Sequence, residues 1–225
     1  MKTVIFDTET TGITEPALIE AAGIIINGSP FDKQTETFNN RYNPGKPISF
    51  GAMATHNILD CDLFDCPPAS DFKLPDDTEY LIGHNIDFDW GVIGKPGNIK
   101  LIDTLPMSRK IWTGLDSYNL GALSYALATD KVKIREFLIN RHSALTDVKL
   151  CLGVLRRILK EKPELKGWES IYKFSEEARI PDVMPFGKHK GMAIKDLPND
   201  YKEWLLKQND IDKYLVIALR KENNI

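Results

Sequence analysis

Short runs of apolar and β-branched residues alternate with turn-forming residues in the first part of the chain. Residues 3–6, residues 18–26 and the more polar residues 35–42 each have the length and composition of a strand. Asn27-Gly28 is a strong turn signal between the second and third runs. The pattern therefore predicts an antiparallel meander of three strands. Glu20 interrupts its apolar run, and we interpret it as an edge-facing carboxylate rather than a partly buried contact.

Helical periodicity becomes frequent after residue 49 and then alternates with short apolar runs. Strands are predicted at residues 79–83 and 100–103. Helices are predicted at residues 50–55 (with Ser49 as N-cap), from residue 84, and at 105–112, 118–127 and 144–159. A helix is also predicted to begin within residues 66–71. Alternating strands and helices favour parallel pairing with helices over the sheet. The whole order predicts an α/β, ribonuclease H-like fold with a mixed five-stranded sheet.

A polar, proline-containing stretch at residues 160–167 follows the long helix and is typical of a linker. We predict a first domain at residues 1–160, a linker with a short helix at 161–180, and a small α+β domain at 181–225. This last domain should contain a Gly- and Pro-punctuated extended piece and two closing helices.

The overall charge of −3 and the pI near 5.9 exclude a globally basic surface, so nucleic acid would have to contact local patches or bound cations. Cys61, Cys66 and Cys151 form no C-x-x-C pair and suggest unpaired thiols in a reducing compartment. No apolar run is long enough for a bilayer and no signal-peptide pattern precedes the first strand, so we expect a cytoplasmic protein without membrane contact.

Two carboxylates, Asp7 and Glu9, follow the first predicted strand. In extended backbone, residues two apart point to the same side. Their mutual repulsion can be relieved by protonation of one acid or by a hard divalent cation. A solvated Thr/Gly-rich turn is the alternative, because a lone D-x-E is common in turns.

Two further acids make the cation hypothesis stronger. In a ribonuclease H-like sheet the first strand is central, so the chain around Asp89 and the helix carrying Asp147 can both approach Asp7 and Glu9. Four carboxylates at one place would require cations, and Mg²⁺ or Mn²⁺ suits such an oxygen shell. His142, five residues before Asp147, is a candidate proton acceptor, although a histidine at a helix start is more often a cap or surface residue.

Three short motifs in this order resemble those of the DEDD superfamily of exonucleases, histidine branch. The motifs are Asp7-Thr8-Glu9-Thr10-Thr11-Gly12, His84-Asn85 with Phe88-Asp89, and His142 with Ala144 and Asp147. The segment from Asn43 to Ile58 is also similar to the family, except that Asn57 stands where the family usually has Gly. Residues 184–191 (MPFGKHKG), with Leu197-Pro198, Tyr201 and Trp204-Leu205, resemble the small domain that follows the nuclease core in exonuclease X-like enzymes.

The resemblance implies 3′-5′ hydrolysis of DNA to nucleoside 5′-monophosphates, with a free 3′ end of single-stranded or duplex DNA as the partner. Asp7, Glu9, Asp89 and Asp147 would hold two divalent ions, and His142 would act as general base. Thr10, Met53, His56 and Asn85 would lie near the terminal nucleotide. DNA repair is the setting that this resemblance implies.

Basic residues near these motifs give weaker indications of nucleic-acid contact. Lys131, Lys133, Arg135 and Arg141 lead toward His142 and either follow the phosphate backbone or form a solvated loop. Lys188 and Lys190 either touch nucleic acid or decorate a glycine-rich hairpin, which we favour. The pattern around Trp90, Trp112 and Trp204 predicts core positions rather than base-stacking ones.

Three other functions remain open. The same chemistry could serve proofreading beside a polymerase or trimming of RNA. A catalytically silent nucleic-acid-binding module of the same fold is the alternative from another class.

Overall fold

A computed structural model describes residues 2–32, 35–139 and 142–223 of the chain. The contacts divide it into two compact units, Met1–Lys173 and Phe174–Ile225. The domain boundaries expected from the sequence remain a prediction. Within the described residues, no helix is both long and apolar enough to cross a membrane.

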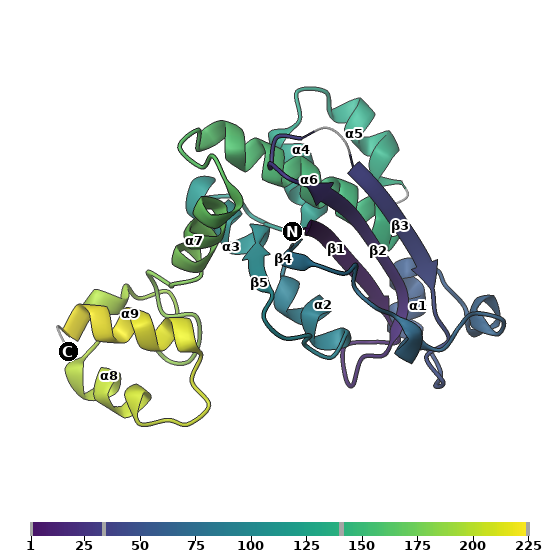
Figure 1. Cartoon of the computed structure of the whole chain (residues 1–225). Coiled ribbons are helices and arrows are strands. Elements are labelled where there is room, and N and C mark those ends of the chain that lie inside the picture. Colours follow the sequence, from purple (N-terminus) through teal and green to yellow (C-terminus); the bar gives the residue numbers. More distant parts are fainter. Residues whose placement is uncertain (1, 33–34, 140–141, 224–225) are drawn as a thin grey trace. The chain divides into compact units, whose positions relative to one another are not determined.

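The first unit is built on a five-stranded sheet in the order β3-β2-β1-β4-β5 (Figure 1). Its strands are β1 (Lys2–Thr10), β2 (Leu18–Asn27), β3 (Thr35–Arg41), β4 (Thr78–Gly83) and β5 (Lys100–Asp103). The pairs β1–β2 and β2–β3 are antiparallel, whereas β1–β4 and β4–β5 are parallel. This arrangement confirms the predicted mixed sheet, with an antiparallel meander joined to parallel strands.

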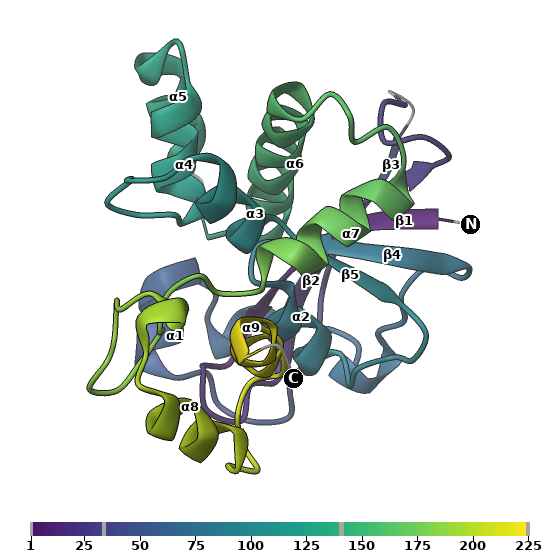
Figure 2. The same cartoon turned by 90° about the vertical axis from the view of Figure 1, so that its left-hand side faces the viewer.

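The two faces of the sheet are covered by different helices (Figures 1 and 2). On one face, α2 (Ile86–Val92) contributes Ile86 to a core with Val4 and Phe6 of β1. On the other face lies α6 (Ala144–Glu161), which presents an apolar stripe to β1 and β2. Because strand side chains alternate, the odd-numbered residues of β1, including Asp7 and Glu9, point to the α6 side.

The other helices of this unit begin at polar caps. They are α1 (Phe50–His56), α3 (Thr104–Ile111), α4 (Leu120–Leu127) and α5 (Lys131–Leu138). Their capping side chains, which accept backbone N–H bonds in the first turn, are Ser49, Asp103, Asn119 and Asp130.

Two segments differ from the sequence prediction. The basic stretch that we could not distinguish from a solvated loop forms α5, because Asp130 caps a run of residues compatible with a helix. Residues 66–71 do not begin an α-helix. The short 3₁₀ turn Ala69–Asp71 is found there instead, since Pro67 and Pro68 interrupt the backbone hydrogen bonding of a helix, and another 3₁₀ turn, Asp60–Leu63, precedes it.

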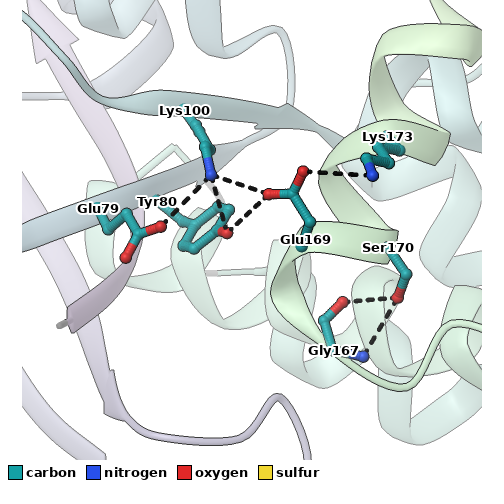
Figure 3. A network of polar contacts seen from close by, with 7 residues as sticks. All are labelled: Glu79, Tyr80, Lys100, Gly167, Glu169, Ser170 and Lys173. Atoms are coloured by element: carbon teal, nitrogen blue, oxygen red, sulfur yellow. Dashed lines mark hydrogen bonds and ion pairs between the residues drawn. The ribbon is translucent and has the colours of Figure 1, made fainter.

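The helix α7 (Trp168–Ala178) starts on the first unit, at the β4–β5 edge of the sheet. Figure 3 shows the contacts: Glu169 accepts from Lys100 at 2.8 Å and from the Tyr80 hydroxyl at 3.2 Å. Trp168 is buried, its ring centroid lies 6.3 Å from that of Tyr80, and its indole N–H donates to the Gly28 carbonyl. The first turns of α7 are therefore anchored to the sheet.

The second unit has its own small core. It contains a hairpin with a β-bridge between Val183 and Ala193, a 3₁₀ turn (Ile194–Asp196), α8 (Asn199–Leu206) and α9 (Lys213–Asn223). The buried residues that these elements share are Met184, Ile194, Leu197, Leu205, Leu215, Ala218 and Leu219.

Candidate active site

Three of the predicted acids come together at the end of β1. Carboxylate oxygens of Asp7, Glu9 and Asp147 lie within 4.8 Å of one another. Asp7 and Glu9 share one side of β1, and Asp147 stands in the first turn of α6, the helix that covers that side. An all-oxygen set of this kind fits Mg²⁺ or Mn²⁺ rather than a soft metal.

The protonation of these acids reflects their crowding. Burial raises the pKa of Asp7 well above its usual value, and the charges of Asp89, Asp147 and Glu9 raise it further. Burial, followed by the charges of Asp147, Glu20 and Asp89, raises the pKa of Glu9 to about 8. Burial and crowding therefore favour the neutral form of Glu9 at neutral pH unless positive charge is supplied.

Asp89 is held beside this group by Thr8. The backbone N–H of Thr8 donates to Asp89 Oδ1 at 2.9 Å, and the Thr8 hydroxyl donates to the same oxygen at 2.6 Å. Burial raises the pKa of Asp89 to about 7, while both bonds from Thr8 lower it. The structure thus brings the fourth predicted acid into electrostatic contact with Asp7 and Glu9.

Glu20 is a fifth acid at this end of the sheet, and our edge-facing interpretation of it was wrong. The residue is 2% exposed. One carboxylate oxygen accepts the N–H of Ala144 at 3.0 Å, and the other pairs with Arg41 Nε at 3.1 Å. Glu20 opposes Glu9 in the β1–β2 ladder, so it lies on the α6 face, where its charge contributes to the raised pKa of Glu9.

The loop that leads from β4 to Asp89 is fixed by side chains of the next strand–helix turn. Asp103 accepts the N–H of Asn85 at 2.9 Å and also caps α3 through Leu105. The ring of His84 lies between the Thr104 hydroxyl and the Tyr118 carbonyl, and burial lowers its pKa. Asn85 has a φ of 74°, a left-handed value that asparagine tolerates better than most residues.

His142 lies in the turn directly before α6, five residues ahead of Asp147. Its backbone also takes a left-handed φ, 66°, and the side chain is half-buried. Ser143, the next residue, is the N-cap of α6, and its carbonyl accepts the N–H of Asp147 at 3.1 Å. The position of His142 relative to Asp147 is therefore set by a defined helix start.

A pocket of about 740 Å³ opens beside Glu9. Its lining includes Thr10 and His56, together with Gly12, Ser49 and Ala52 of the facing segment. His56 Nδ1 accepts the N–H of Ile58 at 3.0 Å, and burial lowers the pKa of the ring, so the neutral imidazole carries its proton on Nε2.

Met53 and Asn57, in the segment from Asn43 to Ile58, both lie outside the pocket lining. Met53 packs against the core cluster of Ile19 and Ile48 and is not among the residues that line the pocket. Asn57, which stands where the family usually has Gly, ends α1 with a left-handed φ of 59°. Asparagine fills this glycine position because it is the side chain best tolerated there.

The predicted basic residues do not form one group. Lys131 and Arg135 are one helical turn apart on α5, whereas Lys133 lies on another face and pairs with Asp130 at 3.7 Å. Arg141 lies outside the described residues. Lys188 and Lys190 belong to the hairpin of the second unit, as the glycine pattern suggested.

Thr8, Glu20 and Asp103 are the residues around the site that the sequence did not identify as supports. Each is polar and stands within or at the end of an apolar strand, and each is buried. That combination is the signal that could have found them, because buried polar groups require partners.

Comparison with curated proteins finds exonucleases. Exodeoxyribonuclease 10 of Escherichia coli strain K12 is 28% identical over 218 residues, covering 92% of this chain and 91% of the relative. DNA polymerase III subunit epsilon of Buchnera aphidicola is 31% identical over 166 residues, covering 65% of this chain and 68% of the relative. Residues 177–210 match a family described as "Putative quorum-sensing-regulated virulence factor".

Solved structures agree with the curated relatives. Exonuclease X in complex with 5′ overhanging duplex DNA superimposes with a TM-score of 0.60 at 25% identity, covering 77% of this chain and 99% of that one. Exonuclease I of E. coli with a dA16 oligonucleotide gives a TM-score of 0.58 at 15% identity, over 81% of this chain and 46% of that one, and shows the fold alone. The predicted ribonuclease H-like fold is confirmed by these neighbours.

Proposed function

The chain belongs to the DEDD superfamily of 3′-5′ exonucleases, and we propose that it hydrolyses DNA from a 3′ end with divalent ions held by Asp7, Glu9, Asp89 and Asp147. The observation that carries the proposal is the group of carboxylate oxygens of Asp7, Glu9 and Asp147 within 4.8 Å. Burial and this crowding raise the pKa of Asp7 and of Glu9, and bound cations would remove this penalty.

We propose two Mg²⁺ or Mn²⁺ ions, because four carboxylates offer enough oxygen ligands and negative charge for two. When bound, the ions lower the pKa of water and stabilise the charge that develops on the phosphate. The chain's own contribution is to hold the ligands in place. Thr8 orients Asp89, and Glu20 fixes the start of the helix that carries Asp147.

His142 is proposed as the general base. Histidine is the side chain that most often acts as general base, and here it would take a proton from the attacking water. The turn before α6 places it five residues from Asp147, and its left-handed backbone is the kind of local strain found at functional positions.

The pocket beside Glu9 is proposed to receive the terminal nucleotide. The backbone around Glu9 and Thr10 would meet the 3′-hydroxyl, and His56, which also lines the pocket, would lie beside the last nucleotide. Thr10 is held by a bond from its hydroxyl to the Gly12 carbonyl at 3.0 Å. Asn85, fixed by Asp103, would contact the same end of the strand.

DNA is proposed as the substrate because the relative that matches nearly the whole chain is named an exodeoxyribonuclease and the superimposed exonuclease X is bound to DNA. The test is a panel of 5′-labelled single-stranded DNA, duplex DNA and RNA of the same sequence, each with Mg²⁺, Mn²⁺ or EDTA. Shortening from the 3′ end with release of 5′-mononucleotides is expected from DNA in the presence of metal only.

A matched pair of variants makes this test specific. Asp7→Asn should abolish the shortening, whereas Asp76→Asn, at an exposed acid, should not change it. Activity that persists in EDTA or in Asp7→Asn would contradict the proposal.

Proofreading beside a polymerase is a second candidate, favoured by the 31% identity to a DNA polymerase III epsilon subunit. It would require preferential removal of a mismatched 3′ nucleotide and co-purification with a polymerase. Equal rates on matched and mismatched ends would count against it.

A further inference from the structure

The second unit carries an aromatic pair on α8, in which the half-buried Tyr201 packs against the small core and Trp204 does not. The sequence pattern predicted Trp204 as a core residue, and this was wrong, because its side chain is 53% exposed. Its neighbour Leu205 fills the core instead. Trp204 stacks on Tyr201 of the same helix, α8, with ring centroids 5.5 Å apart and an interplanar angle of 23°.

The hairpin of the unit adds cations to this aromatic pair. Lys188 Nζ lies 5.2 Å from the centroid of the Tyr201 ring, and the His189 ring lies 4.5 Å from it. Lys190 follows directly and is exposed. We call Lys188, His189, Tyr201 and Trp204 the cation–aromatic surface.

The hairpin holds its side chains in a defined geometry. The N–H of Met184 donates to the Met192 carbonyl at 2.8 Å, and the N–H of Gly191 donates to the Met184 carbonyl at 2.8 Å. Gly187 has a φ of +69°, and an added Cβ would lie 3.3 Å from the Tyr201 hydroxyl. A glycine is therefore needed where the hairpin passes over the tyrosine.

The cation–aromatic surface lines a recess of about 670 Å³ together with Pro198 and Asp200. The carboxylate of Asp200 accepts the backbone N–H of Tyr201 at 2.9 Å. An exposed indole beside lysines is the combination that binds single strands, since any base can stack on the ring while the cations meet phosphates.

We propose that this surface binds single-stranded DNA, with a base stacked on Trp204 and the adjoining phosphates against Lys188 and Lys190. The surface and the nuclease site belong to one chain. DNA bound at the surface would therefore have a raised effective concentration at the nuclease site. The inference rests on the proposed DNA substrate but assigns a second contact outside the nuclease unit.

The experiment measures binding of a fluorescein-labelled dT20 strand to the full chain in EDTA, by anisotropy. Trp204→Ala should weaken binding roughly tenfold, the loss of about one stacked base. Trp204→Phe should bind with intermediate affinity. Lys188→Ala should weaken binding and reduce the slope of log affinity against log salt by about one.

Two variants of the same unit serve as matched controls. Lys213 also lies over a tyrosine, 4.5 Å from the Tyr214 ring centroid, and Ile217 is an exposed apolar residue on α9. Lys213→Ala and Ile217→Ala should bind dT20 as the wild type does.

Hydrolysis of the p-nitrophenyl ester of thymidine 5′-monophosphate with Mn²⁺ separates this inference from the proposed function, because the ester is too small to reach a second contact. Trp204→Ala and Lys188→Ala should hydrolyse it at the wild-type rate. A wild type that does not hydrolyse the ester would remove the proposed function without touching the binding result. The inference would be overturned if Lys188→Ala bound dT20 as tightly as the wild type and if a folded Trp204 variant, Trp204→Ala or Trp204→Phe, also did so.

Discussion

Thr8 gives Asp89 two hydrogen bonds at a single oxygen, from its backbone N–H and from its hydroxyl. The paired register of β1 and β4 ends at Ile5 and Ile82, three residues before Thr8. Beyond that point the side chain of Asp89, rather than a neighbouring strand, satisfies the Thr8 N–H. An acid from α2 is thereby attached to β1 between Asp7 and Glu9.

Thr8→Val is expected to destabilise the protein by about 1–2 kcal/mol, because it removes a hydrogen bond to an acid but keeps the shape of the side chain. Since the Thr8 bonds lower the pKa of Asp89, this pKa should rise, and activity at neutral pH should fall by roughly tenfold or more. Chemical denaturation and the pH dependence of hydrolysis measure the two effects.

Thr3→Val is the matched control on the same strand. The Thr3 hydroxyl is buried without a hydrogen-bond partner among the described residues. Its removal should leave stability unchanged or raise it by about 1 kcal/mol, with no effect on activity. If both valine variants lost the same stability, the Thr8–Asp89 bond would have no special role.

Glu20→Ala is expected to cost about 2–3 kcal/mol. It leaves the buried N–H of Ala144 without its acceptor and removes the partner of Arg41. Glu20→Gln keeps an acceptor oxygen and should recover part of the loss. Thermal unfolding of both variants in EDTA tests this, and equal destabilisation by Ala and Gln would show that charge rather than the bond to Ala144 matters.

Asp7→Asn should reduce turnover by about three orders of magnitude or more while the metal-free protein stays as stable or becomes more stable, because one of several repelling acids is removed. Addition of Mn²⁺ should raise the melting temperature of the wild type much more than that of Asp7→Asn. A variant that is inactive because it is unfolded would be recognised by its melt in EDTA.

The stability of the metal-free protein should depend on pH through Glu9. Its pKa is about 8 in the folded chain, above its usual value of 4.5, so the folded state binds this proton more tightly than the unfolded state. The contribution of Glu9 is fully present below about pH 4.5 and is lost as the pH rises to about 8. The unfolding free energy of the wild type minus that of Glu9→Gln, both measured in EDTA, should therefore become more negative from about pH 4.5 to about pH 8. A value that becomes more positive over this range would contradict the crowding of the acids.

His142→Asn is expected to lower turnover by roughly two to four orders of magnitude and to leave the Mn²⁺-induced rise in melting temperature intact. Asparagine is chosen because it tolerates the left-handed φ of 66° at this position. Lys95→Asn, at another left-handed position with a φ of 54°, is the control for the backbone. Unchanged turnover in His142→Asn would exclude His142 as the base.

The sequence was sufficient for the strands, most helices and the side of β1 that carries Asp7 and Glu9, because periodicity reports which side of an element is buried. It did not reveal that α5 is a helix, although Ile134, Phe137 and Leu138 recur at three- and four-residue steps, because the basic residues among them also suit a solvated loop. Glu20 and Trp204 were misplaced for one shared reason. A local pattern records residue type, whereas burial depends on what packs against the residue.

By itself, the sequence determined the groups of the proposed site, four acids in order with a histidine before the last, and a sheet whose first strand is central. Only the tertiary structure decided that Thr8 donates hydrogen bonds to Asp89 and that Glu20 accepts the N–H of Ala144 at the start of α6. It also decided that Trp204 is exposed and stacks on Tyr201, over which Lys188 lies. The first two relationships join residues that are distant in the chain. The third depends on which side chains the neighbouring elements leave exposed. Hydrogen bonding, burial and charge act between such residues only after folding has brought them together.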